Sequence, residues 1–204
     1  MDTQKLAGRV CEFLREMPEV VHCCLYGSLM RGSCDAYSDI DLEVDVSGCD
    51  NGAFILELPK RFSERFDVIF FDYAPSLAPE KYVVTLALDA ENPFATVDIA
   101  AVATPHMVSV SRQDLNRRNN LYDHTLKLFS ANLKHFLRGA DCRRDIEKMY
   151  SRLFDHDPSL MKKSQMLREV YSWLKDNTQN RHRPFVAAFE KHMEKLPQQR
   201  DHPG

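Results

Sequence analysis

Apolar residues in the first half of the chain occur in short runs that Gly, Pro, Asp and Ser interrupt. An apolar residue at every third or fourth position predicts a helix, whereas alternation or a short continuous apolar run predicts a strand. Residues 40–46 alternate clearly, with Asp41, Glu43 and Asp45 on the polar face of the predicted strand. In chain order, the predicted elements are a helix at 6–14, strands at 20–26 and 40–46, a helix at 54–62, and strands at 66–71, 82–88 and 95–102.

Turn residues at 89–93 separate the last two predicted strands, so these two strands are expected to form a hairpin. The first half therefore contains, in order, a helix, two strands, a helix and three strands. This order predicts a mixed sheet of the α/β or α+β class.

Helical periodicity continues through the second half, from residue 111 to residue 197. Four apolar stripes, at 122–136, 146–154, 167–174 and 185–196, predict a small helical bundle. Two helix starts are also visible in the sequence. Ser111 with Asp114 has the pattern of an N-terminal cap, and Asp157 before Pro158 predicts a capped helix with proline at its first position.

The pattern changes near residues 104–106, which predicts two domains, a sheet domain at 1–107 and a helical bundle at 108–204. The chain has 204 residues, of which 44% are hydrophobic and 28% are charged. These values are typical of a globular protein with enough apolar surface to form a substantial core.

The net charge of −3 argues against a dedicated nucleic-acid binder, which would carry a basic excess. No run approaches membrane-spanning length, and no N-terminal segment resembles a signal peptide, so no membrane partner is expected. The six cysteines form no CxxC pair, which argues against a structural zinc site. We expect reduced thiols in a cytoplasmic protein.

The stretch from Gly27 to Asp41 carries the candidate chemistry. Gly27 follows a predicted buried strand, where the lack of a side chain lets the backbone approach a ligand closely. Ser28 adds a hydroxyl group at a point where a short helix can begin, and backbone N–H groups there would suit a phosphate. Arg31 makes the following loop positive.

Asp39 and Asp41 stand two apart on a predicted strand, so their carboxylates share one face. The two negative charges repel, and a divalent cation such as Mg²⁺, which prefers oxygen ligands, removes that cost. Two metal ions at such a pair can activate a hydroxyl group and hold nucleotide phosphates. Glu43 continues the same face one step further out and is the weaker candidate ligand.

A two-metal site needs a third carboxylate, and two acids that interrupt apolar runs, Asp98 and Asp67, are candidates. Asp98 is favoured, because the hairpin that carries it can lie beside the strand of Asp39. Asp67 begins its predicted strand and could simply cap it. Asp98 would then complete a metal site and accept the proton of the acceptor hydroxyl.

Gly27-Ser28, ten intervening residues, Asp39-x-Asp41 and a later acid together resemble the DNA polymerase β-like nucleotidyltransferase superfamily. Within it, the motif looks much like that of the antibiotic (aminoglycoside and lincosamide) nucleotidyltransferases and the minimal nucleotidyltransferases. The resemblance implies a polymerase β-like mixed sheet followed by a C-terminal helical bundle. It also implies that Gly27 and Ser28 hold the triphosphate, that Asp39, Asp41 and Asp98 bind two Mg²⁺ ions, and that Asp98 is the general base.

The implied reaction transfers a nucleoside monophosphate from a nucleoside triphosphate, with ATP the expected donor, to a hydroxyl group and releases pyrophosphate. Members of the superfamily often direct a lysine of the helical domain at the triphosphate. Lys127 and Lys134 are seven residues apart on one predicted helix face, so either is a candidate. A solvated surface position is the commoner role for such a lysine.

The acceptor stays open at this point. The first expectation is a small hydroxyl-bearing molecule such as an aminoglycoside or lincosamide, because an acidic cleft attracts a polycation. The alternatives are a protein or RNA acceptor, or a non-catalytic nucleotide-binding protein on the same fold. A homodimer is compatible with the sequence but not indicated by it. Arg118-x5-His124 has the loose Arg–His spacing of HEPN ribonucleases, and all histidines are expected to be surface or hydrogen-bonded residues.

Overall fold

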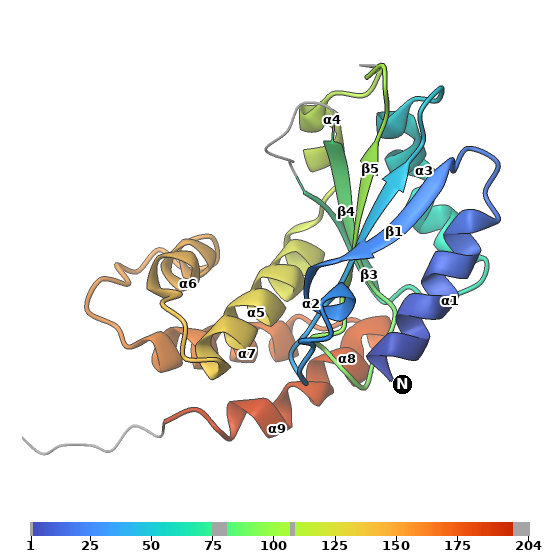
Figure 1. Cartoon of the computed structure of the whole chain (residues 1–204). Coiled ribbons are helices and arrows are strands. Elements are labelled where there is room, and N and C mark those ends of the chain that lie inside the picture. The colour runs from blue at the N-terminus through green and yellow to red at the C-terminus, as the bar shows by residue number, and fades with distance from the viewer. Residues whose placement is uncertain (1, 75–80, 107–108, 198–204) are drawn as a thin grey trace, which may run out of the picture.

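A five-stranded mixed sheet forms the centre of the computed structural model, which describes residues 2–74, 81–106 and 109–197 (Figure 1). The strand order is β1-β2-β5-β4-β3. β1 pairs antiparallel with β2, β2 pairs parallel with β5, and β4 pairs antiparallel with both β5 and β3. The strands are β1 (His22–Tyr26), β2 (Ile40–Asp45), β3 (Phe70–Ala74), β4 (Lys81–Ala87) and β5 (Val97–Val102).

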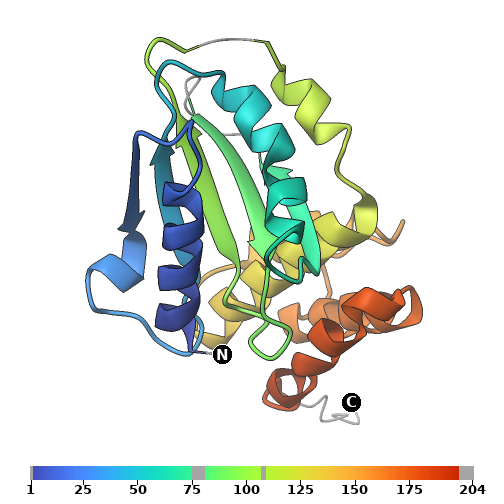
Figure 2. The ribbon, with the colours of Figure 1, turned by 90° about the vertical axis from the view of Figure 1, so that its right-hand side faces the viewer.

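One face of the sheet is apolar and lies under two helices, α1 (Thr3–Arg15) and α3 (Asn51–Ser63). Figure 2 shows α1 and α3 side by side across this face. Ile40, Leu42 and Val44, which alternate along β2, are fully buried in the core beneath these helices. The alternation seen in the sequence therefore produces the half-buried strand that it predicts, with the polar positions of β2 on the opposite face.

The second half of the chain is helical and packs against the sheet near β3 and β4. Its elements are α4 (Arg112–Asn116), α5 (Leu121–Leu137), α6 (Arg143–Tyr150), α7 (Lys163–Asp176), the 3-10 helix η1 (Asn180–His182), α8 (Arg183–Ala188) and α9 (Glu190–Met193). The buried cluster around Phe129 and Phe189 also includes Phe70, Ala87 and Phe94. The helical core is thus continuous with apolar residues of the sheet half.

The predicted fold class, a mixed sheet followed by a helical region, is confirmed. The hairpin is confirmed as the β4–β5 pair, and the Ser111 cap is confirmed as a capping box with Asp114. The predicted boundary between residues 107 and 108 lies outside the described residues.

The predicted strand at 66–71 is confirmed only at its last two residues, because β3 runs from Phe70 to Ala74. Phe66 does not join the ladder. Its amide donates to the carbonyl of Phe62 at 2.8 Å, and its ring stacks on the Phe62 ring at a centroid distance of 5.3 Å. The apolar residue at this position belongs to the layer between α1 and α3, so it does not mark a strand.

The predicted helix start at Asp157 and Pro158 is also wrong, because the helix α7 begins at Lys163. Both carboxylate oxygens of Asp157 accept from Ser159, from its backbone N–H at 2.9 Å and from its hydroxyl at 2.8 Å. Asp157 therefore closes a local turn. The short carboxylate side chain that makes Asp a good N-cap also suits such turns, and the two uses compete. Each of the six cysteines is a free thiol, and no described helix is long and apolar enough to cross a membrane.

Candidate active site

Three carboxylates meet at the polar face of the sheet. Asp41 on β2 lies directly opposite Asp98 on the parallel strand β5, and Asp39 immediately precedes β2. One oxygen from each of Asp39, Asp41 and Asp98 lies within 4.8 Å of the other two. Of the two candidates for a third acid, Asp98 belongs to this cluster, whereas Asp67 is exposed and lies outside it.

Gly27 makes room for this cluster. Its φ of +70° is in the left-handed region, which favours glycine. A Cβ atom at this position would lie 2.1 Å from Oδ2 of Asp41. The glycine after β1 is therefore required by the close approach of the Asp41 carboxylate as well as by the backbone conformation.

Burial and mutual repulsion act on the carboxylates. Burial, followed by the charges of Asp39 and Asp98, raises the pKa of Asp41 to about 6. Burial also raises the pKa of Asp98. The hydrogen bond that Thr85 donates to Oδ1 of Asp98 offsets part of this rise. Such a group of charges is costly without a cation. Because the donors are all carboxylate oxygens, the cluster fits a hard divalent cation such as Mg²⁺.

The polar row continues across the sheet beyond the carboxylates. In register, Tyr26, Asp41, Asp98, Thr85 and Asp72 follow one another on β1, β2, β5, β4 and β3. Register partners on neighbouring strands project to the same face, so these five side chains line one surface. Burial, with the charges of Asp41 and Asp98, raises the pKa of the Tyr26 phenol to about 12.

Helix α5 lies against this row and contributes its two candidate lysines. The Nζ atom of Lys134 lies 2.5 Å from Oδ2 of Asp39, and the Lys134 side chain is only 9% exposed. The Nζ atom of Lys127 lies 2.8 Å from Oδ2 of Asp72, which is fully buried. Both lysines are therefore held in ion pairs at the polar row, so neither is a solvated surface lysine.

Asp72 and Thr85 were missed by the reading of the sequence. Asp72 interrupts an apolar run, Phe70-Phe71-Asp72-Tyr73, the same signal that singled out Asp67 and Asp98. It is held from α5 by Lys127 and by His124, whose Nδ1 lies 2.9 Å from its Oδ1. His124 is thus hydrogen-bonded, as expected for the histidines, whereas His192 departs from that expectation, because it is buried and its Nδ1 has no hydrogen-bond partner among the described residues.

The loop before β2 is also held by Arg138, which directly follows the last residue of α5. Arg138 donates two hydrogen bonds to Asp35, from Nε at 3.0 Å and from a terminal nitrogen at 2.5 Å. The Ser38 hydroxyl bonds to the Asp35 carboxylate at 3.0 Å, and the Asp35 amide donates to that hydroxyl at 2.9 Å. Because Asp39 is the next residue, these contacts fix the segment that carries the first carboxylate.

The remaining predicted positions lie around the cluster. Ser28 is half-buried in the short helix α2 (Gly27–Met30), and Arg31, which follows this helix, is exposed. The charge of Arg31 is among those that lower the pKa of Asp41. The carboxylate of Glu43 forms an ion pair with Lys81 at 2.6 Å and is not part of the cluster of three aspartates.

No family model and no curated protein matches the chain. Among solved structures, the chain is similar to the Cid1 poly(U) polymerase, at 19% sequence identity and a TM-score of 0.31. The similarity covers 66% of this chain and 38% of that one. A likeness of this size assigns no reaction, so the class is defined by the site itself, a candidate divalent-metal centre on a mixed sheet.

Proposed function

We propose that this protein is a Mg²⁺-dependent nucleotidyltransferase that moves a nucleoside monophosphate from a nucleoside triphosphate to a hydroxyl group and releases pyrophosphate. The observation that carries the proposal is the meeting of Asp39, Asp41 and Asp98 within 4.8 Å beside Gly27. The spacing of these residues in the sequence and their convergence in space both support the same site.

Each carboxylate has a role in the proposal. Asp39, Asp41 and Asp98 would hold two Mg²⁺ ions, which when bound neutralise phosphate charge and acidify the attacking hydroxyl. Thr85 engages Oδ1 of Asp98, so the other oxygen of Asp98 is the one available to the acceptor. In the reaction, the acceptor oxygen forms a bond to the α-phosphorus, the bond to pyrophosphate breaks, and the hydroxyl proton passes to Asp98.

The triphosphate would lie beside α2, against Gly27 and Ser28, with Arg31 supplying positive charge. Lys134 and Lys127 are proposed to turn toward the phosphates from α5. This role is supported by the position of both lysines at the polar row, where Lys134 contacts Asp39. An incoming triphosphate carries anionic oxygens that compete with the Asp39 carboxylate for the Lys134 ammonium group.

For the acceptor, we propose a small hydroxyl-bearing molecule, with ATP as the donor. The carboxylates of the polar row support a cationic acceptor such as an aminoglycoside, because a concentration of negative charge attracts a polycation. A protein or RNA acceptor is the alternative. The presence of a third carboxylate favours catalysis over a purely nucleotide-binding role.

The proposal is tested by calorimetric titration of the four nucleoside triphosphates with Mg²⁺ into the full chain. Binding should need the metal and should be lost in Asp39→Asn/Asp41→Asn. The matched control is Asp67→Asn, which removes an exposed acid outside the cluster and should bind as the wild type does. The preferred nucleotide then enters a pyrophosphate-release screen with candidate acceptors. Folded wild-type protein that binds no triphosphate with Mg²⁺ or Mn²⁺ would contradict the proposal.

A further inference from the structure

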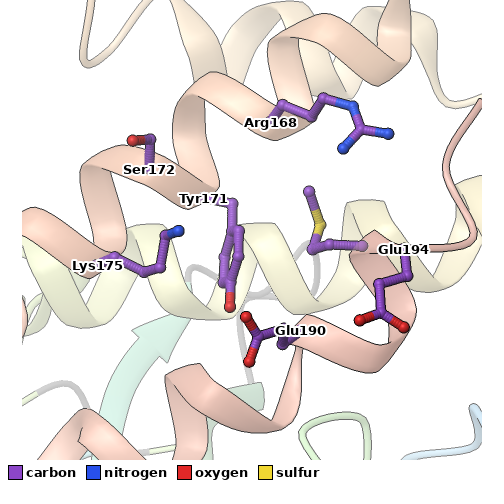
Figure 3. A pocket seen from close by; sticks show the side chains of 7 residues that line it. Arg168, Tyr171, Ser172, Lys175, Glu190 and Glu194 are labelled. Atoms are coloured by element: carbon purple, nitrogen blue, oxygen red, sulfur yellow. The ribbon is translucent and has the colours of Figure 1, made fainter. Parts of the chain in front are cut away.

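Two surface hollows away from the carboxylate cluster differ in their charge. The first lies between α7 and α9 and has a volume of about 460 Å³. Figure 3 shows that Arg168 and Lys175 line one side of it, while Glu190 and Glu194 line the other. Its two positive and two negative groups offset each other, so this hollow has no preference for an anion or a cation.

The second hollow, which we call the α3–β3 hollow, has a volume of about 500 Å³. Ligand sites commonly measure several hundred cubic ångströms and combine an apolar lining with a few polar groups. The floor of the α3–β3 hollow is apolar and partly aromatic. It is formed by Leu56, Pro59, Val68, Phe71 and Tyr73.

Positive groups also line this hollow. Lys60, Arg118 and Arg181 line the hollow and are exposed, and none of the described residues that line it carries a carboxylate. Arg181 is anchored by the buried Asp123, whose Oδ2 lies 3.4 Å from its guanidinium group. Burial raises the pKa of the Tyr73 phenol, the charge of Arg118 opposes this rise, and the charge of Glu57 on α3 adds to it, so both charges lie near this residue.

The position of the hollow separates it from the carboxylate cluster. Phe71 and Tyr73 alternate with Asp72 along β3, so they lie on the opposite face of the sheet from the polar row. Phe71 and Tyr73 accordingly belong to the core that includes α1 and α3. A molecule in the α3–β3 hollow is therefore distinct from the nucleotide proposed for the other face.

We propose that the α3–β3 hollow is a second binding site, for an organic anion with an apolar body. Lys60 and Arg118 line the hollow with no carboxylate among its described lining residues, and Arg181 shares its charge with Asp123. Because the net charge of the whole chain is −3, this hollow is locally cationic and favours an anion. Guanidinium groups bind carboxylate and phosphate oxygens in paired hydrogen bonds. The apolar floor would contact the body of the same molecule. This inference does not depend on the proposed transferase activity.

The experiment uses 1-anilinonaphthalene-8-sulfonate, an aromatic anion, as a fluorescent probe of the full chain. A single saturable site is expected. Lys60→Ala/Arg118→Ala should weaken binding at least tenfold, and Ser63→Glu, which places a carboxylate on the exposed edge of the hollow, should do the same. The matched control, Arg168→Ala/Lys175→Ala, removes the same two residue types from the charge-balanced hollow and should change affinity by less than twofold.

Two further arms define the ligand chemistry. The neutral dye N-phenyl-1-naphthylamine, which shares the apolar body but lacks the charge, should bind at least tenfold more weakly than the anion. Competition between 1-naphthoate and 1-naphthyl phosphate then distinguishes a carboxylate ligand from a phosphate ester. The proposal is overturned by non-saturable binding, by equal affinity for the neutral dye, or by equal losses in the hollow and control variants. Circular dichroism establishes that each variant is folded.

Discussion

At the scale of single residues, the absence of one carbon atom at Gly27 allows the carboxylate cluster to form. Gly27→Ala should reduce stability by about 1–2 kcal/mol through its left-handed backbone alone. Its Cβ atom would also meet Oδ2 of Asp41 at 2.1 Å and displace that carboxylate. We therefore expect Mg²⁺ affinity to fall at least tenfold, as measured by calorimetry.

Gly32 provides the control for this substitution. It also has a positive φ, of +66°, but an added Cβ atom there would meet nothing within 4 Å. Gly32→Ala should therefore lose a similar amount of stability in thermal melts and keep the wild-type affinity for Mg²⁺. Equal losses of metal affinity in the two variants would show that backbone strain, and not contact with Asp41, explains the effect of Gly27→Ala.

A second residue-scale prediction concerns the cost of keeping Asp41 ionised. Its pKa is raised from an ordinary 3.8 to about 6, chiefly by burial. Between about pH 4 and pH 6 the folded protein thus holds more protons on Asp41 than the unfolded chain does. Stability falls as pH rises through that window. Asp41→Asn should raise metal-free stability at pH 7 by about 1–2 kcal/mol, which is less than the full shift would give because the site is partly solvated.

Urea unfolding in EDTA at pH 4 and pH 7 measures this effect. The gain from Asp41→Asn should be present at pH 7 and nearly absent at pH 4, where the unfolded chain is close to half protonated at this position. With saturating Mg²⁺ the order should reverse, because the wild type gains binding energy that the variant cannot. A variant that is less stable than wild type in EDTA at pH 7 would contradict the proposed repulsion.

At the scale of elements, the C-terminal end of α5 supplies the contacts that hold the loop before β2. Arg138 forms an ion pair with Asp35, which in turn bonds to Ser38 beside Asp39. An exposed ion pair contributes only about 0–1 kcal/mol to stability, so Arg138→Ala should scarcely change the melting temperature. It should nevertheless weaken binding of the Mg²⁺–nucleotide complex about three- to tenfold, because the segment that carries Asp39 loses its anchor.

Arg65→Ala is the matched control for Arg138→Ala. Arg65 also forms an exposed ion pair, with Glu16, and lies just beyond the end of α3, away from the loop. The two variants should have similar stability, and only Arg138→Ala should change nucleotide affinity in calorimetry. Unchanged affinity in Arg138→Ala would mean that Lys134 and the strand β2 position Asp39 without help from Arg138.

The strongly periodic elements were predictable because side-chain periodicity is a local property of the sequence. Gly27, Asp39 and Asp41 were found in the same way, from spacing along one segment. Asp98 could be proposed only through an assumed strand pairing. Asp72 was missed because its place in the polar row depends on the register of β3 against β4, which is a long-range contact.

The errors have the same physical origin. The apolar residues near Phe66 pack under helices and not in the ladder, and the sequence alone does not distinguish these two kinds of burial. Asp157 has two competing uses, as a helix cap or in a turn with Ser159, and the structure selects the turn. Likewise, the ion pairs of Lys127 and Lys134 depend on how α5 lies across the sheet, which no local pattern encodes.

At the scale of the whole molecule, the two faces of the sheet have different roles. One face is apolar and builds the core with α1 and α3, while the other carries the polar row that α5 partly covers. The buried cluster of the helical half contains Phe70 and Phe94 from the sheet half. Shared burial of this kind couples the two halves, so we expect the chain to unfold as one cooperative unit.

The only tryptophan of the chain, Trp173 on α7, reports on the helical half and makes this expectation testable. Leu58 is fully buried in the cluster under α3, which does not include Trp173. Leu58→Ala should cost about 2–5 kcal/mol. If the halves are coupled, Trp173 fluorescence and far-UV circular dichroism should shift together to lower urea concentration. If instead the Trp173 transition keeps its wild-type midpoint while the circular dichroism signal splits, the two halves unfold independently, as two separate domains would.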